Sequence, residues 1–412
     1  MRKSEIDPRF MDWAKLLVNH SLGSQFKKAG DSIKEKLVIV NGEVVTEPLM
    51  LACAHAILEA GGYPSLNPYF SGYVRGCGTG LPDIESGTET QRTHIPAFRE
   101  AMFNEAGAQI YLLGGESPHL FAPYQEGVSQ IRKANKPLAD RRLSKPWVLT
   151  LFPTKADSVV EGFPTLEEYT EFLFSASVID YEDLRKKQES LKEVLQKTRV
   201  VKMVTYDRRT GRQCELELEI GNRKTHNDVE SCIGTHNVAD GEVFTSPNWQ
   251  DVNGEVVLNV PVMYNGVELG DVYLKIRDGQ ILEHRAEKGQ DALTSIIETD
   301  EGSHRIGEVA FGTNPGVRPL KSPLYAEKIG GTMHLAIGAS YADRYPEVIA
   351  CKADLEREIA IEGLVADKRL NKSAQHVDIP TYFKDPRHGE KVFLDDVEYA
   401  WDNKSGLWRA AA

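Results

Sequence analysis

Two short apolar runs within residues 306–341 each contain a single side chain of the kind that binds metal ions. Glu308 interrupts the first run, I-G-E-V-A-F-G-T-N-P, and His334 interrupts the second, G-T-M-H-L-A-I-G. If both runs are strands, successive side chains point to opposite faces, so residues two apart share a face. Small residues such as Ala310 and Ala336 then flank each polar side chain, and large apolar residues occupy the opposite face. This pattern predicts two strands with a functional site on one face.

The first third of the chain alternates between helical and strand patterns. Apolar residues at helical spacing predict helices at residues 8–22, 48–60, 95–106 and 124–136, and short apolar runs predict strands at residues 36–40, 109–113 and 147–152. Alternation of this kind predicts a parallel sheet covered by helices. Residues 71–83 are rich in glycine, but the strand–loop–helix frame and the lysine of a phosphate-binding loop are missing, so we expect a surface loop.

The pattern changes after a long charged helix that is predicted at residues 181–198. Its few apolar positions suit an exposed or domain-bridging helix, or a solvated helix that packs on one side. Alternating apolar and polar positions then predict strands at residues 200–205, 214–220, 254–260, 270–276 and 280–285. Three residue pairs are hairpin signals, namely Asn253-Gly254, Asn265-Gly266 and Asp278-Gly279. Helices are expected near residues 291–299 and 351–368. The sequence therefore predicts an α/β protein, α+β overall, with an N-terminal α/β domain at residues 1–190 and a mainly antiparallel β domain with helices at residues 191–412.

Composition narrows the class of protein further. The chain has 412 residues, of which 41% are hydrophobic and 27% charged, as expected for two or three globular domains. A formal net charge of −12 argues against a general nucleic-acid binder, which needs clustered Lys and Arg. The five cysteines form no C-x-x-C pair, so we expect free thiols in a reducing compartment. There is no secretory signal and no run of about 18 apolar residues, so we expect a cytoplasmic protein without a membrane span.

Candidate chemistry is concentrated in the second half of the chain. Glu242 follows a glycine in D-G-E-V-F-T, as Glu308 does in its own run, and His376 and Asp378 form the motif Q-H-V-D. In an extended segment, His376 and Asp378 project from the same face. Three carboxylates and two imidazoles, counting His334, are enough to hold a pair of zinc, cobalt or manganese ions. The intervals along the chain are long, so only the fold could bring these side chains together.

Four motifs occur in the order found in a known peptidase family. G-E-V-F-T-S-P, I-G-E-V-A-F-G-T-N-P, E-K-I-G-G-T-M-H-L-A-I-G and N-K-S-A-Q-H-V-D make residues 232–380 resemble the thermophilic aminopeptidase T family of metalloaminopeptidases, peptidase family M29. The earlier chain is similar more loosely, through A-I-L-E-A-G-G and G-F-P-T-L-E-E-Y-T-E-F. The resemblance implies a two-domain homodimer that releases N-terminal amino acids from peptides, using water activated by two divalent metal ions.

The resemblance also implies roles for individual residues. The metal ligands of the family fall on Glu242, Glu308, His334, His376 and Asp378. A family tyrosine seven residues after the ligand histidine matches Tyr341, where it would help to stabilise the transition state. Glu308 is also placed to act as general base, and the choice between ligand and base stays open. A charged segment makes the interval between His334 and His376 longer than is usual in the family, and Val377 stands where the family commonly has an aromatic residue.

Two other functions remain as alternatives at this point. The first is a mononuclear iron ring-cleaving dioxygenase on the same scaffold, although such an enzyme would not need all five ligands. The second is a non-catalytic binding protein with a relic site, against which the intact ligand set argues.

Overall fold

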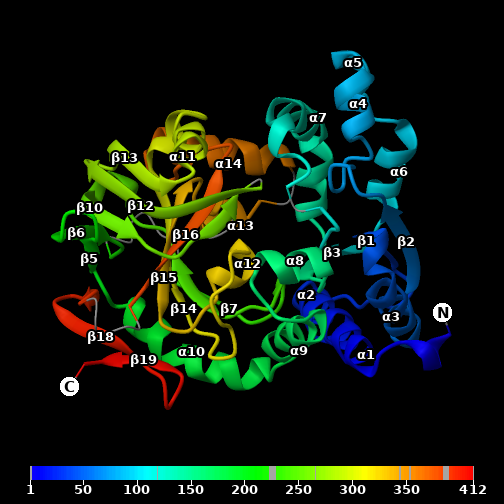
Figure 1. The fold of residues 1–412 in the computed structure, drawn as a ribbon, viewed down its shortest axis with the longest axis horizontal. Helices are drawn as coiled ribbons and strands as arrows, with labels where there is room; N and C mark the ends of the chain where they lie inside the picture. Colours follow the sequence, from blue (N-terminus) through cyan, green and yellow to red (C-terminus); the bar gives the residue numbers. More distant parts are fainter. Residues whose placement is uncertain are drawn as a thin grey trace. The chain divides into compact units, whose positions relative to one another are not determined.

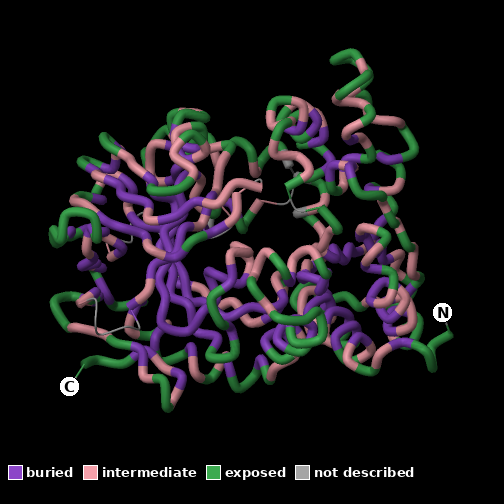
Figure 2. Tube along the Cα trace, in the orientation of Figure 1, coloured by how far each residue is buried: buried purple, intermediate pink, exposed green. Residues whose placement is uncertain are grey.

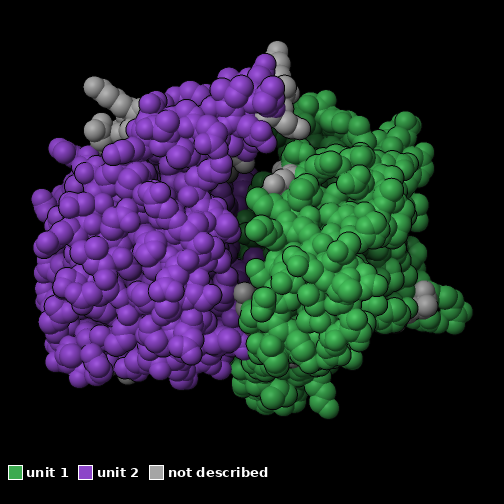
Figure 3. Space-filling model, turned by 90° about the horizontal axis from the view of Figure 1, so that it is seen from above, with its two compact units in different colours: residues 1–179, 234–240 green, residues 180–233, 241–412 purple. Residues whose placement is uncertain are grey.

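The chain forms two compact units, which Figure 3 shows in different colours. A computed structural model describes residues 2–117, 119–221, 229–264, 266–342, 345–351, 354–383 and 389–411. The first unit contains residues 1–179 and 234–240, and the second contains residues 180–233 and 241–412. The division that we expected after residue 190 falls inside helix α10 (Tyr181–Leu195), which lies wholly in the second unit. Residues 234–240 belong to the first unit, although residues of the second unit precede and follow them in the chain. The pattern of apolar residues in the sequence does not indicate this.

The first unit is built around a parallel sheet (Figure 1). In spatial order, its strands are β2 (Tyr63–Tyr69), β1 (Leu37–Glu43), β3 (Ala108–Leu113), β4 (Trp147–Leu151) and β8 (Asn237–Val238). Its α-helices are α1 (Pro8–Lys15), α2 (Gly23–Lys28), α3 (Glu47–Glu59), α4 (Leu81–Ser86), α5 (Glu89–Thr93), α6 (Ala97–Glu105), α7 (Gln125–Leu143), α8 (Lys155–Val160) and α9 (Leu166–Ser177). The predicted alternation of helix and strand is confirmed. Strands β2 and β8 were not predicted.

The second unit contains a large antiparallel sheet. In spatial order, its strands are β11 (Val262–Tyr264), β12 (Val267–Arg277), β10 (Val252–Leu258), β6 (Arg212–Glu219), β5 (Val200–Asp207), β17 (Lys391–Leu394), β18 (Val397–Asp402) and β19 (Leu407–Ala410), with β13 (Gln280–Lys288) paired to β12. Asp278-Gly279 forms the predicted hairpin turn, since Arg277 pairs with Gln280. Asn265 lies outside the described residues, although β11 and β12 pair on either side of it.

The hairpin predicted at Asn253-Gly254 is wrong. Both residues lie inside β10, where Gly254 pairs with Leu216 on one side and Ile276 on the other. Gly254 has a φ of 125°, and a Cβ there would lie only 2.1 Å from the carbonyl oxygen of Glu215. Glycine is therefore required for a close approach between strands, and this use of Asn-Gly looks the same in sequence as a turn.

A second antiparallel sheet lies in the same unit. In spatial order, its strands are β16 (His376–Tyr382), β15 (Thr332–Gly338), β14 (Ile306–Gly312), β9 (Glu242–Thr245) and β7 (Glu230–Cys232). The remaining helices of the unit are α11 (Gln290–Ile297), α12 (Pro323–Ala326), α13 (Pro346–Ile349) and α14 (Asp354–Ala366). Every residue of β14 and β15 is buried (Figure 2), so these two strands form the centre of the unit.

Helix α10 is amphipathic and packs on one side, which is the second of the two arrangements expected from its sequence. Its apolar positions are few, but they recur at helical spacing and lie on one buried face. The buried residues are Tyr181, Leu184, Gln188, Leu191 and Leu195. Leu191 and Leu195 join the core cluster that the two sheets of the second unit share.

The five cysteines are free thiols, as expected. Burial raises the pKa of the Cys53 thiol well above its ordinary value, which makes this group a poor nucleophile. In the described part of the chain, no helix has both the length and the apolar composition that crossing a bilayer requires.

Candidate metal centre

The register of the second sheet brings the candidate ligands to one face. Directly opposed residues of an antiparallel pair project to the same side, as do residues two apart on one strand. Gly312 lies opposite Glu242, and Ala310 lies opposite His334. Because Glu308, Ala310 and Gly312 share a face of β14, Glu242 and His334 project to the side of Glu308.

Strand β16 completes this face. Ala336 lies opposite Glu308 on one side and opposite Asp378 on the other, and Gly338 lies opposite His376. The small residues predicted to flank the polar side chains thus share this face with them. The other face carries core residues, among them Val309, Phe311, Met333, Leu335 and Ile337.

Glu308 occupies the middle of the cluster and is 2% exposed. Its Oε1 atom lies 3.2 Å from Nε2 of His334, and its Oε2 atom lies 3.3 Å from Nε2 of His376. The two oxygens of one carboxylate therefore face two different histidines. Glu308 therefore contacts both histidines, one through each oxygen.

Glu242 on β9 and Asp378 on β16 each lie close to one of the histidines. Glu242 Oε2 lies 3.5 Å from Nε2 of His334, and Asp378 Oδ1 lies 3.4 Å from Nε2 of His376. Two groups result, each with ligand atoms within 4.8 Å of one another. They are Glu242, Glu308 and His334, and Glu308, His376 and Asp378. All five predicted ligands are thus brought together, with Glu308 in both groups.

His376 and Tyr341 are oriented by hydrogen bonds. Nδ1 of His376 lies 2.8 Å from the carbonyl oxygen of Ala339, so it carries the proton and leaves Nε2 as the ligand atom. The Tyr341 hydroxyl lies 3.1 Å from that Nε2 atom, and its ring packs against Phe244 with centroids 5.3 Å apart. Tyr341 is 40% exposed. Tyr341 therefore contacts the candidate ligand His376 and is also partly accessible to solvent.

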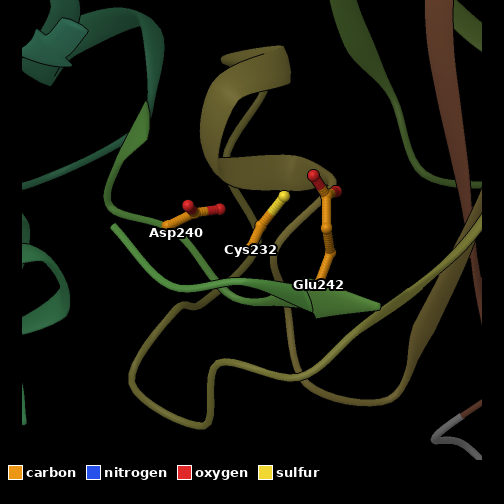
Figure 4. A group of neighbouring side chains, drawn as sticks. All are labelled: Cys232, Asp240 and Glu242. Atoms are coloured by element: carbon orange, nitrogen blue, oxygen red, sulfur yellow. The ribbon is translucent and has the colours of Figure 1, made fainter. Parts of the chain in front are cut away.

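The strand that carries Glu242 is held by helix α10. Cys232 of β7 lies directly opposite Glu242 and projects to the same side (Figure 4). Nε2 of Gln188 donates to the carbonyl oxygens of Cys232 (3.0 Å) and Glu242 (3.2 Å). We assigned no role to Cys232 or Gln188 from the sequence, because neither residue belongs to a motif with ligand spacing.

Attraction between the carboxylates and the histidines affects the pKa values of Glu308, His334 and His376 more than burial does. Burial disfavours the charged form of Glu308, but the hydrogen bond with His334 and the attraction to His376 outweigh it and lower its pKa. Burial lowers the pKa of His334, but the hydrogen bond with Glu308 and the nearby carboxylates outweigh it and raise the pKa to about 9. The pKa of His376 is also raised well above its ordinary value, because Asp378 and Glu308 outweigh burial.

The cluster contains buried oxygens that lack a hydrogen-bond donor among the described residues. These atoms are Glu242 Oε2, Glu308 Oε2 and Asp378 Oδ1. An unsatisfied buried acceptor costs roughly 1–3 kcal/mol, and more when it is charged. Carboxylate oxygens and imidazole nitrogens directed at common points suit divalent metal ions, so the residues fit a metal pair.

Two buried charged residues beside the ligands were missed by the sequence analysis. Glu327 is 7% exposed and Lys328 is 1% exposed. Glu327 also lies within ligand distance of His334 and Asp378, and burial raises its pKa to about 8. The motif E-K-I-G-G-T-M-H contains both residues, but an adjacent Glu-Lys pair is common on protein surfaces and gives no sign of burial.

Asp300 fixes the segment that leads into β16. Its Oδ2 atom accepts a hydrogen bond from the backbone N–H of Ala374 (2.6 Å). Its Oδ1 atom accepts from the Ser373 hydroxyl (2.8 Å) and from the backbone N–H of Ser303 (2.9 Å). Burial opposes the ionisation of Asp300, but these hydrogen bonds outweigh it and lower its pKa. Asp300 thereby sets the point at which His376 enters the sheet.

We expect Asp300→Ala to lower the free energy of unfolding by about 2 kcal/mol at pH 7, since it removes hydrogen bonds to a charged acceptor. Because the folded pKa is lowered, this contribution is complete above the unfolded pKa of about 3.9 and is lost as pH falls through the folded pKa. Urea unfolding at pH 7 and pH 3 measures the change. Glu298→Ala, at an exposed position, is the control and should change stability by less than about 0.5 kcal/mol. Equal losses for Asp300→Ala at both pH values would contradict this account.

The fold and the cluster of carboxylates and imidazoles indicate a metalloprotein, with the candidate ligands in the second unit. The family described as Thermophilic metalloprotease (M29) matches residues 6–385, and the chain belongs to this family. The family expected from the four sequence motifs is thus confirmed.

Similar proteins align over part of their length. Aminopeptidase AmpS of Bacillus subtilis (strain 168) is 35% identical over 158 residues, which cover 36% of this chain and 35% of the relative. Aminopeptidase T of Thermus thermophilus is 26% identical over 265 residues, which cover 58% of this chain and 64% of the relative. The chain thus matches less than two thirds of either relative. The solved structure of wild-type AmpT from Thermus thermophilus has a TM-score of 0.70 over 98% of both chains at 19% identity, and it confirms the predicted fold class.

Proposed function

We propose that the protein is a metal-dependent aminopeptidase that releases N-terminal amino acids from peptides. The observation that carries the proposal is the position of Glu308, whose two oxygens face His334 and His376. Membership of a metalloprotease family supports a hydrolytic reaction, and two similar proteins are named aminopeptidases.

Two divalent ions, such as zinc, cobalt or manganese, would be held by the five side chains on the sheet face. Glu242, Glu308 and His334 would hold one ion, and Glu308, His376 and Asp378 would hold the other. Both oxygens of Glu308 are directed at ligand positions, which leaves neither free to accept a proton. We therefore propose that Glu308 would act as a ligand in both groups, in preference to a general base.

Tyr341 is the proposed catalytic donor. When bound, the metal ions lower the pKa of coordinated water and polarise the scissile carbonyl. Burial of the Tyr341 hydroxyl, together with the charges of Glu308 and Asp378, raises its pKa well above the ordinary value. The hydroxyl therefore stays protonated at neutral pH and can donate a hydrogen bond to the oxygen on which negative charge develops.

Peptide substrates, a homodimeric assembly and a cytoplasmic location complete the proposal. The free α-amine of a peptide is recognised by a metal ion or by an acidic side chain, and the sheet face offers both kinds of partner. The motif resemblance supports the homodimer. Five free thiols support a reducing compartment.

Metal-depleted protein should hydrolyse no amino-acid p-nitroanilide, and added Zn²⁺, Co²⁺ or Mn²⁺ should restore hydrolysis. The matched control substrate is the N-acetylated p-nitroanilide, which lacks the free amine and should not be cleaved. Metal analysis of the active protein should find about two ions per chain. One iron per chain with no hydrolysis under any metal would favour the ring-cleaving dioxygenase. Two bound ions without hydrolysis would favour a non-catalytic binding protein.

A further inference from the structure

Lys328 places a positive charge inside the ligand cluster. Its ammonium group lies 2.6 Å from Glu242 Oε1 and 2.8 Å from Glu327 Oε1. Burying an ammonium group is costly unless a carboxylate compensates its charge. Glu327 alone provides one compensating charge, so the shorter contact with Glu242 calls for a separate explanation.

The backbone around Lys328 is fixed to the sheet that carries the ligands. The N–H of Lys328 donates to the carbonyl oxygen of Tyr325 (3.0 Å), and its carbonyl oxygen accepts from the N–H of Asn314 (3.0 Å). The next residue, Ile329, forms a parallel bridge with Asn314, which lies two residues beyond the end of β14. The backbone of Lys328 is therefore anchored beside the strand of Glu308.

The two oxygens of Glu242 have different surroundings. Lys328 occupies Oε1, whereas Oε2 has no hydrogen-bond partner among the described residues and lies 3.5 Å from Nε2 of His334. A carboxylate with both oxygens free can bind a metal ion through one oxygen or through both. We infer that Lys328 is a positioning residue that holds Oε1 of Glu242, so that Glu242 binds its metal ion through Oε2 alone. This inference rests on the proposed metal centre.

Glu327 allows Lys328 to hold Oε1 of Glu242 without adding a net positive charge to the metal centre. Two divalent ions and three ligand carboxylates carry a net positive charge, which an uncompensated ammonium would increase to the disadvantage of metal binding. Burial raises the pKa of Glu327 in the metal-free protein, but two bound divalent ions would favour its ionised form. The ion pair with Lys328 would then be neutral, and Lys328 would orient Glu242 through a short hydrogen bond without adding positive charge to the centre.

The double variant Lys328→Met/Glu327→Gln tests the inference, because it removes the contact with Oε1 of Glu242 together with the acidic partner of Lys328. Metal-depleted full-length protein is titrated with Zn²⁺ in competition with a chromophoric chelator, and Co²⁺ absorption reports the coordination. We expect the Kd of one of the two ions to rise about 10–100-fold, which is the usual effect of removing a residue that hydrogen-bonds to a metal ligand. The Kd of the other ion should stay within about threefold of its wild-type value. The matched control is Lys275→Met/Glu283→Gln, an exposed pair whose charged atoms lie 2.6 Å apart, compared with 2.8 Å for Lys328 and Glu327. It should change neither Kd.

A crystal structure of the metal-loaded wild type tests the same inference without a substitution. We expect Lys328 Nζ on Oε1 of Glu242 and the metal ion on Oε2. Coordination through Oε1, or a double variant with both affinities unchanged, would overturn the role of Lys328. Hydrolysis of p-nitroanilides by the wild type is measured separately. A wild type that binds two ions but hydrolyses nothing contradicts the aminopeptidase and leaves the positioning role intact.

Discussion

Glu308→Gln should lower kcat/KM for an amino-acid p-nitroanilide by at least about 100-fold, which corresponds to about 2.7 kcal/mol of lost transition-state stabilisation. Glutamine keeps the shape of the side chain but replaces one ligand oxygen by an amide nitrogen that does not bind metals. Because both ligand groups contain Glu308, the loss affects both metal positions. Metal analysis should therefore find that the content falls from about two ions per chain to one or fewer.

The control for this substitution is Glu283→Gln, which makes the same chemical change on the exposed surface of β13. It should leave turnover and metal content unchanged. Circular dichroism should show that both variants are folded. If Glu308→Gln retained two metal ions and near wild-type turnover, the assignment of Glu308 as a ligand of both ions would be wrong.

Tyr341→Phe should lower kcat by about 10²–10³-fold, the usual effect of removing one donor to a developing oxyanion. Here the metal content should stay at about two ions per chain, because the Tyr341 hydroxyl lies 3.1 Å from a ligand atom and is not itself one of the five ligands. KM should change little, since the hydrogen bond strengthens only as charge develops. Steady-state kinetics together with metal analysis therefore separates this variant from Glu308→Gln.

Tyr206→Phe is the matched control for the loss of a phenolic hydroxyl. Its hydroxyl contacts Gln213 at 3.2 Å on the large sheet and should not affect turnover. A Tyr341→Phe variant with unchanged kcat would remove Tyr341 from the reaction. A variant that lost metal ions would show that Tyr341 acts by supporting His376.

The face that carries Glu308 and His334 was predictable from the sequence, because successive side chains of a strand point to opposite faces. Glu308 and His334 each stand between small residues, and that local pattern alone placed them on one face of their strands. The sequence could not reveal that Gly312 pairs with Glu242 or that Ala336 lies between Glu308 and Asp378, because register depends on contacts far apart along the chain. The four family motifs supplied the remaining members of the set.

The errors share a physical cause, since each involves a residue whose role is set by distant neighbours. Gly254 resembles a turn residue, but the approach of Glu215 from the next strand is what requires glycine. Lys328 resembles a surface lysine, and only the positions of Glu242 and Glu327 account for its burial. Residues 234–240 leave the second unit to add β8 to the parallel sheet, a tertiary event without a local pattern.

The alternation of faces along β14, β15 and β16 has a consequence for how this chain can change over evolutionary time. Inserting or deleting one residue within a strand reverses the parity of every position beyond it, and would bury a ligand in the core while turning an apolar side chain toward the metal ions. The segment between Tyr341 and His376 is free of this constraint. Its described residues include α13 and α14, and four of them, Tyr345, Val348, Leu364 and Leu370, form a separate apolar cluster. Changes in length can accumulate there while the ligand strands keep their register.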